Sequence, residues 1–128
     1  MSWMLDTNIA IHLRDGDPAV VEAVGALEGG ILLSIVTRVE LEGGVRRELT
    51  GAAARRARLD TILAALPVVP FDEAAADAYR NIVEQAGYSR RKLLDRMIAA
   101  QAIVCRVTLI TRNAEDFRDV PGLPLQVW

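Results

Sequence analysis

Short apolar runs alternate along the chain with longer stretches in which apolar residues recur every three or four positions. Each short run is bounded by polar or turn-forming residues, a pattern typical of buried β-strands. The predicted strands are Trp3–Leu5, Ile31–Ile35, Pro67–Phe71, Val107–Ile110 and Leu125–Val127. Proline cannot donate to a strand ladder, so the two prolines of the third run place that strand at a sheet edge.

In the segments between these runs, apolar residues recur every three or four positions, as in helices. Three predicted helices follow the capping residues Asp6, Asp17 and Asp72, and a fourth begins at Thr37. Two more span Ala52–Leu66 and Leu93–Cys105, and Asn113–Phe117 forms a single helical turn. Thr37 with Glu40 three residues later forms a capping-box pattern, and this helix is expected to continue to Leu49. Strands that alternate with helices predict an α/β fold with a parallel sheet, in a single domain over residues 1–128.

Composition excludes several functional classes. The net charge of −2 excludes a nucleic-acid-binding protein whose whole surface is basic, although it allows a local basic patch. One histidine and one cysteine leave too few ligands for a multi-histidine zinc site and no partner for an internal disulfide. The apolar runs are far shorter than the ~20 residues of a membrane span. We therefore expect a cytoplasmic protein without a membrane interaction, whose chemistry depends on carboxylates.

Four acidic side chains occupy the positions where strands end and helices begin. Asp6 ends the first strand, Glu40 and Asp95 lie in the first turns of predicted helices, and Asp116 follows the fourth strand together with Asn113. In a parallel sheet these ends meet at one edge, so the carboxylates are expected to converge. Carboxylates held together repel one another unless a divalent cation neutralises them. Mg²⁺ or Mn²⁺ prefers such ligands, and a bound metal activates water for attack on a phosphodiester.

Each acid also has a purely structural interpretation. Asp6 can cap the helix that follows it, and Glu40 can be the capping-box partner of Thr37. Asp95 can be a second N-cap, although it shares a helix face with apolar residues and so points inward. Asp116 alone is typical of a surface residue. The functional interpretation therefore depends on the four positions jointly.

The basic residues around Asp95 suit a polyanionic substrate. Candidate contacts are Arg90, Arg91, Lys92, Arg96 and, after the fourth strand, Arg112. Lys92 is the only lysine, and arginine favours bidentate contacts to phosphate. The clusters at 46–47 and 55–58 are interpreted as solvated helix faces.

The same residues carry a family resemblance that covers nearly the whole chain. The matching stretches are 4–9, 37–41 with 44–45, 69–72, 95–102, 109–113 with Phe117, and 120–128. Together they resemble a PIN-domain ribonuclease of the VapC type, the toxin of bacterial toxin–antitoxin pairs. The resemblance implies a three-layer α/β/α sandwich with a five-stranded parallel sheet. It also implies a Mg²⁺- or Mn²⁺-dependent endoribonuclease, a homodimer and a cognate antitoxin.

The resemblance also assigns site residues. Asp6, Glu40 and Asp95 match the acidic positions of the family, with Asp6 and Asp95 as metal ligands, and Asn8 and Thr111 lie in matching stretches as supporting residues. The chain departs from the family pattern at two positions. Leu93 stands where many members carry an acid, and Asn113 stands where many carry Asp. Asp116 is therefore expected to be the fourth acid, with Asn113 as its helper.

Three alternative functions remain open. Phosphoryl transfer to Asp6 requires an acid at position 8, where the chain has Asn8. A phospho-acceptor receiver domain requires a lysine after a late strand, whereas Lys92 precedes a helix. A catalytically inactive module that only binds a protein partner is the third. For the antitoxin, we expect an apolar helix in a groove between the predicted helices 37–49 and 52–66, with Arg or Lys reaching the acids.

Overall fold

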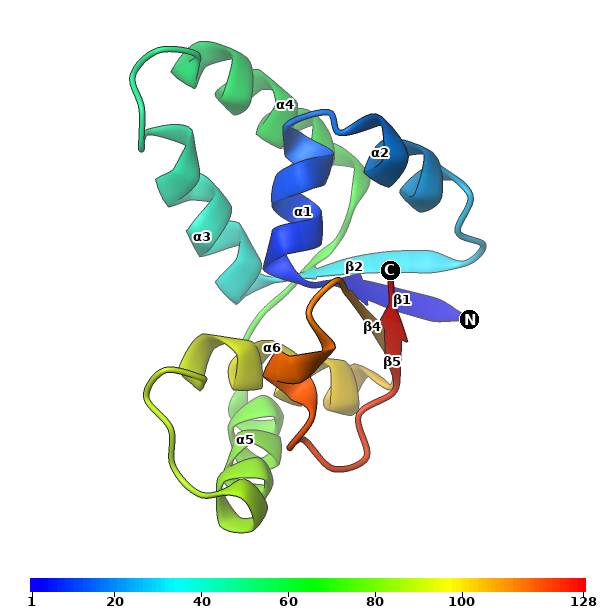
Figure 1. The fold of residues 1–128 in the computed structure, drawn as a ribbon, viewed down its shortest axis with the longest axis vertical. Coiled ribbons are helices and arrows are strands. Elements are labelled where there is room, and N and C mark those ends of the chain that lie inside the picture. The colour runs from blue at the N-terminus through cyan, green and yellow to red at the C-terminus, as the bar shows by residue number, and fades with distance from the viewer.

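The computed structural model describes all residues 1–128 and has one five-stranded parallel sheet (Figure 1). The strands are β1 (Ser2–Leu5), β2 (Gly30–Ser34), β3 (Val68–Val69), β4 (Thr108–Thr111) and β5 (Leu125–Val127). Their order is β3-β2-β1-β4-β5, and every neighbouring pair is parallel. This topology confirms the α/β class, and the short β3 lies at an edge as its prolines predicted.

Helices cover both faces of the sheet. They are α1 (Thr7–Arg14), α2 (Pro18–Gly25), α3 (Ile35–Val45), α4 (Ala52–Ala65), α5 (Glu73–Ala86), α6 (Leu93–Cys105) and the short 3₁₀ turn η1 (Ala114–Phe117). Figure 1 shows α1 to α4 on one side of the sheet, and α5, α6 and η1 on the other. The three-layer α/β/α sandwich is thus confirmed. None of the helices combines the length and apolar character that a membrane crossing requires.

Successive residues of the central strands supply two separate cores. Met4 and Leu109 pack with α5, α6 and η1, whereas their neighbours Leu5 and Ile110 pack with α1 to α4. Side chains alternate between the faces of a strand, so a continuous apolar run is required where both faces are covered. The adjacent apolar pairs Met4–Leu5 and Leu109–Ile110 follow from this burial, and both strands lie inside the sheet.

Three aspartates cap helices where the sequence predicted them. The carboxylate of Asp6 accepts a hydrogen bond from the Thr7 amide, and that of Asp17 accepts one from the amide of Ala19. Asp72 accepts from the Ala75 amide at 2.9 Å. Side-chain acceptors satisfy amides that have no partner within the helix.

The predicted start of α3 at Thr37 is wrong. The helix begins at Ile35 directly after β2, and Ser34 is its N-cap, because the Ser34 hydroxyl accepts a hydrogen bond from the Val36 amide at 2.9 Å. Thr37 is buried inside the helix, so the capping-box interpretation of Glu40 is also wrong. The helix ends at Val45 and does not reach Leu49. Burial of Val36 and Thr37 against the core outweighs the weak helix propensity of branched side chains.

Two adjacent glycines in α3 should respond oppositely to substitution by alanine. A Cβ at Gly43 meets open space, so Gly43→Ala should stabilise the fold by about 0.5–1 kcal/mol through helix propensity. A Cβ at Gly44 lies 2.8 Å from Nη1 of the buried Arg14, which must then move. We expect Gly44→Ala to give no gain or a loss. Urea unfolding of both variants measures the difference, and equal gains would contradict the packing of Arg14 against Gly44.

Candidate active site

Asp6 is fixed at the carboxyl edge of the sheet between the two central strands. It follows β1, and its amide donates to the Ile110 carbonyl of β4 at 2.9 Å. Its carboxylate accepts hydrogen bonds from the Thr111 hydroxyl and from the Thr7 amide, both at 2.8 Å. Asp6 is only 3% exposed. The helix-capping role of Asp6 is therefore real, and one carboxylate oxygen is held by each neighbouring element.

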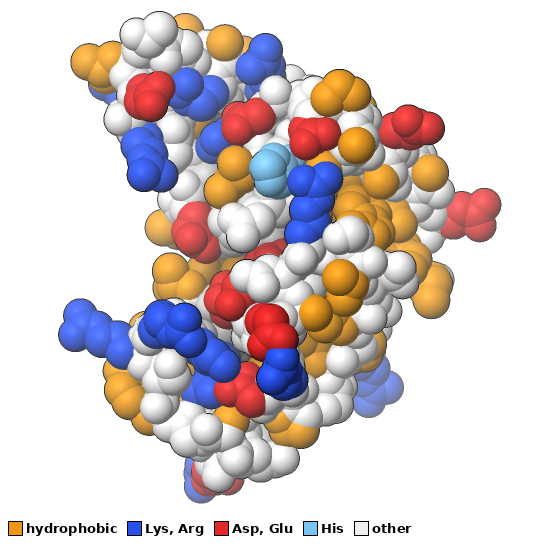
Figure 2. Space-filling view, in the orientation of Figure 1, with side chains coloured by type: hydrophobic (Ala, Val, Ile, Leu, Met, Phe, Trp, Pro, Cys, Tyr) orange, Lys and Arg blue, Asp and Glu red, His pale blue; other side chains and the backbone are white.

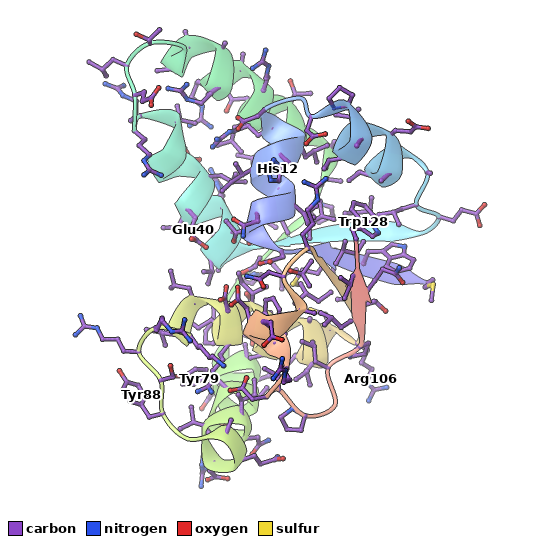
Figure 3. The ribbon with its side chains drawn as sticks, viewed as in Figure 1. His12, Glu40, Tyr79, Tyr88, Arg106 and Trp128 are labelled. Atoms are coloured by element: carbon purple, nitrogen blue, oxygen red, sulfur yellow. The ribbon has the colours of Figure 1, made fainter.

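Thr7 connects Glu40 to this edge, a role that the sequence interpretation missed. Its hydroxyl donates to Oε1 of Glu40 at 2.9 Å and lies 3.0 Å from the Thr37 hydroxyl. Figure 3 shows Glu40 on the part of α3 nearest the start of α1. The available signal was a hydroxyl residue directly after Asp6. In the sequence Thr37 has the features of an N-cap. In the structure it lies within α3, one turn before Glu40.

Asp95 does not cap α6. The N-cap of this helix is Lys92, which makes no side-chain capping bond, and Asp95 lies in the first turn. The capping interpretation of Asp95 is therefore wrong. Its carboxylate is half-buried, and no hydrogen bond within the protein compensates its charge.

Asn113 and Asp116 lie on the same side of η1, as predicted. The Asn113 side chain donates to Oδ2 of Asp116 at 2.7 Å, and the Asn113 amide donates to the Thr111 hydroxyl at 2.9 Å. Thr111 in turn donates to Asp6, so a chain of hydrogen bonds runs from Asp6 to Asp116. Asp116 is half-buried in this arrangement, unlike an isolated surface residue.

The four carboxylates form one electrostatic cluster. Burial raises the pKa of Asp6, and hydrogen bonds from Thr111 and Thr7 only partly oppose this effect. Burial, followed by repulsion from Asp6, Asp116 and Glu40, raises the pKa of Asp95 to about 6, whereas Lys92 lowers it slightly. The negative charges of Glu40 and Asp116 thus reach both aspartates. A cluster of this kind is destabilised by its own charge and favours a cation.

The donor chemistry of the cluster fits a hard divalent cation, although the ligands are not gathered around one point. No three His, Cys, Asp or Glu side chains in the structure are close enough to form a ready metal site. The acids instead stand on β1, α3, α6 and η1 and offer only oxygen donors, the type that Mg²⁺ and Mn²⁺ prefer. Figure 2 shows acidic side chains gathered at the centre of this face, with basic side chains above and below them.

The structure corrects the expected role of Arg96. Its side chain is 2% exposed and donates to the carboxylate of Asp119 at 2.9 Å and to the Gly87 carbonyl at 2.6 Å. A buried guanidinium cannot reach a substrate, so Arg96 is structural. Its position one residue after Asp95 turns it to the adjacent face of α6. Lys92 also pairs with Asp119, at 3.0 Å, and is mostly buried.

The other expected substrate contacts are accessible. Arg90 and Arg91 lie exposed in the loop before α6 and make no ion pair. Arg112 is 40% exposed and lies 4.0 Å from Asp17. Asn8 is exposed in the first turn of α1. These residues lie in the loop before α6, directly after β4 and in the first turn of α1.

Metal-free stability should fall as the pH rises from about 5 to 7. The raised pKa of Asp95 means that the folded protein binds a proton more tightly than the unfolded chain, so deprotonation favours unfolding. The expected loss is about 1 kcal/mol after discounting for the half-exposed carboxylate. The lowered pKa values of Glu42 and Asp119 act at more acidic pH, outside this range. Urea unfolding in EDTA measures the slope; a flat profile, or one unchanged in Asp95→Asn, would contradict the assigned cause.

The apolar surface does not lie between α3 and α4, where the sequence placed the partner groove. An open pocket of about 450 Å³ lies between α1, α2 and α4 and includes Leu13, Val24, Ile62 and Leu66. The opening beside the α3–α4 turn is lined by charged side chains together with Gly44, Gly51 and Ala54. The apolar residues of α4 thus turn toward α1 and α2 at this opening.

Comparisons with known proteins agree with this fold. Residues 3–123 match the model of the PIN domain. Ribonuclease VapC2 of Rickettsia felis is 30% identical over 135 residues, covering 100% of this chain and 98% of the relative. The tRNA(fMet)-specific endonuclease VapC of Shigella flexneri is 29% identical over 131 residues, with the same coverage.

A solved structure extends the similarity to three dimensions. The crystal structure of VapBC2 from Rickettsia felis, bound to a DNA fragment from their promoter, contains a chain similar to this one with a TM-score of 0.85 and 28% identity. The match covers 100% of this chain and 99% of that chain. The sequence matches and the similarity of the fold agree: the chain belongs to the PIN domain family, among its VapC-type members.

Proposed function

We propose that this protein is a divalent-metal-dependent endoribonuclease and the toxin of a VapBC-type toxin–antitoxin pair. The observation that carries the proposal is the self-repelling cluster of Asp6, Glu40, Asp95 and Asp116 at the carboxyl edge of the sheet. Carboxylates that raise one another's pKa cost the protein stability, which is typical of functional sites. The ribonuclease and endonuclease names of the two relatives favour RNA as the substrate.

Asp6 and Asp95 are the best candidates for holding Mg²⁺ or Mn²⁺. Asp6 is already oriented by Thr111 and Thr7. Burial and the neighbouring acids raise the pKa of Asp95 to about 6, so a nearby cation would stabilise its charged form. A bound ion of this type acidifies water and stabilises charge on a phosphodiester oxygen. Glu40, oriented by Thr7, is placed to accept a proton at the margin of the site.

Positive side chains beside the cluster are suited to the substrate backbone. Arg90 and Arg91 are exposed and unpaired, so they can reorient to contact phosphates without breaking an ion pair. Arg112 approaches from the end of β4 and is only loosely paired with Asp17. Lys92 can act at longer range by lowering the negative potential near Asp95.

A toxin of this type requires an inhibitor in a growing cell. The solved relatives include toxin–antitoxin complexes, such as VapBC2 of Rickettsia felis. On this chain, the apolar pocket between α1, α2 and α4 suits an amphipathic helix of an antitoxin. An Arg or Lys of the same partner would then neutralise the acidic cluster. We also propose that the toxin forms a homodimer, as its resemblance to the family implies.

Incubation of purified protein with total cellular RNA tests the catalytic proposal. Cleavage should be lost in EDTA and restored by Mg²⁺ or Mn²⁺, and mapped product ends should show internal cuts. A matched sample of Asp95→Asn controls for contaminating nucleases. Cleavage that persists in EDTA, or no cleavage with either metal, would contradict the proposal; the second result would favour an inactive binding module.

The negative charge supplied by Asp116 should determine how much Mg²⁺ the cleavage reaction requires. Asp116→Asn removes a carboxylate from the cluster and should raise the Mg²⁺ concentration for half-maximal cleavage several-fold. Asn113→Asp adds a carboxylate beside Asp116 and should lower it. Metal titration of the cleavage rate compares the two variants. An unchanged titration for Asp116→Asn would leave a site of three carboxylates.

A further inference from the structure

A continuous groove lined by arginines leads away from the acidic cluster. One part, of about 560 Å³, begins at Glu40 and runs between α1 and α3 past Arg46 and Arg47. A second part, of about 410 Å³, lies beside the α3–α4 turn and reaches Arg58. The two parts share Arg14, Asp15, Gly44 and Arg47 among their lining residues, so they form one path. We call this path the arginine groove.

Three arginines that line the groove have no ion-pair partner, although Asp15, Glu40 and Glu48 line it as well. Arg46, Arg47 and Arg58 are exposed and make no ion pair, in contrast to Arg38 and Arg56 nearby, which pair with Glu42. An unpaired arginine pays no cost of breaking an existing contact when a phosphate arrives. The sequence interpretation treated these positions as a solvated helix surface, because nothing in the sequence shows that they share a concave path.

Arg14 lies fixed in the wall of the groove, paired with Asp15. This residue is only 6% exposed, and it donates from Nε to Asp15 at 3.1 Å and from Nη1 to the Leu41 carbonyl at 3.4 Å. Its Nη2 makes no hydrogen bond within the protein. Gly44 leaves the room that this guanidinium occupies. Nη2 is therefore open to solvent at the wall of the groove, where a phosphate oxygen can contact it.

The composition of the groove favours a nucleic-acid strand over a protein helix. Each of its two parts has a single apolar lining residue, Ile11 or Ala54, so it offers no apolar anchor for an amphipathic helix. The apolar pocket beside α2 provides such anchors elsewhere. A single strand binds instead through its phosphates, and the groove begins at one of the four acids. Cations next to the cluster also offset its repulsion of a polyanion.

We propose that the RNA strand flanking the cleaved phosphodiester lies in the arginine groove, with its phosphates contacted by Arg46, Arg47 and Arg58. This inference rests on the proposed ribonuclease function. It assigns to α3 and the α3–α4 turn a substrate-binding role in addition to the loop before α6. Figure 2 shows basic side chains on both of these sides of the acidic centre.

The test is the salt dependence of binding of a fluorescein-labelled 20-nucleotide RNA, measured by anisotropy. Asp95→Asn serves as the background so that the RNA is not cleaved. Addition of Arg46→Gln and Arg47→Gln should lower the slope of log K against log salt by about 1.4, roughly 0.7 for each lost phosphate contact. At 0.1 M salt the same loss corresponds to binding that is about 25-fold weaker. Arg80→Gln removes an exposed arginine of α5 and should change neither quantity.

Two results would overturn the inference while leaving the proposed nuclease intact. The first is an unchanged slope in the Arg46 and Arg47 variant of a protein that cleaves RNA in the presence of metal. This result would assign the groove to a protein contact. The second is a change of oligomeric state, measured by light scattering, that accounts for the weaker binding. Failure of the wild-type protein to cleave RNA with any metal is a separate result, since it would reject the proposed function itself.

Discussion

Replacement of Asp95 by asparagine should abolish cleavage and stabilise the metal-free protein at the same time. The substitution removes a half-buried charge whose pKa is raised to about 6 by burial and by three neighbouring acids. The folded state is relieved of this repulsion, so its free energy of unfolding at pH 7 in EDTA should rise by about 1 kcal/mol. Cleavage should fall at least about 100-fold, because an asparagine cannot supply the negative charge that a divalent ion requires.

Asp77→Asn is the matched control for this variant. Asp77 lies exposed on α5, away from the cluster, and its substitution should change neither stability nor cleavage. Gain of stability together with loss of activity distinguishes a functional residue from a structural one. Undiminished cleavage by Asp95→Asn would remove Asp95 from the site. A large loss of stability would show that Asp95 supports the fold.

Replacement of Asp119 by alanine should destabilise the protein by about 3 kcal/mol. Asp119 binds both Arg96 and Lys92, and Arg96 is 2% exposed. Without Asp119, the buried guanidinium keeps only its contact with the Gly87 carbonyl, and an uncompensated buried charge is costly. The network is already incompletely satisfied, because Nε of Arg96 and Oδ1 of Asp119 have no hydrogen-bond partner. Urea unfolding at pH 7 measures the loss.

A double-mutant cycle attributes this loss to the buried charge. Arg96→Met removes the guanidinium and retains a long apolar side chain, so Asp119→Ala should cost much less in that background. The exposed pair Arg80–Glu84 on α5 is the control, at 3.1 Å and with side chains 76% and 58% exposed. Its disruption should cost less than about 1 kcal/mol. Additive costs for Arg96→Met and Asp119→Ala would contradict the account.

Most of the fold follows from the periodicity of the sequence. Since β1 and β4 are covered on both faces, each places adjacent apolar residues in the two cores. The segment 93–105 forms a helix because its apolar residues repeat at helical spacing. The start of α3 could not be read in this way. Ser34 and Thr37 are both good caps, and only the packing of Val36 and Thr37 in the core decides between them.

The acidic positions were predictable, whereas their surroundings were not. Parallel strands end at one edge, so the convergence of Asp6 and Asp95 follows from topology, and the pKa shifts agree with it. The contact of Thr7 with Glu40 joins residues 33 positions apart and has no local signal. For Arg96, a basic residue beside Asp95 suggested substrate binding, but its direction depends on the partner Asp119, which only the folded chain brings near.

Calorimetric titration of Mn²⁺ into the metal-free protein tests the central claim, that the four carboxylates form a divalent-cation site. At pH 6, about half of the Asp95 carboxyls carry a proton, which metal binding must displace. Titrations in buffers of different ionisation enthalpy should therefore show proton release near pH 6 and little at pH 8. Asp95→Asn should bind Mn²⁺ much more weakly and without this release. Equal Mn²⁺ affinity for the wild type and Asp95→Asn, or no saturable binding to the wild type, would contradict the assignment of this cluster as the metal centre.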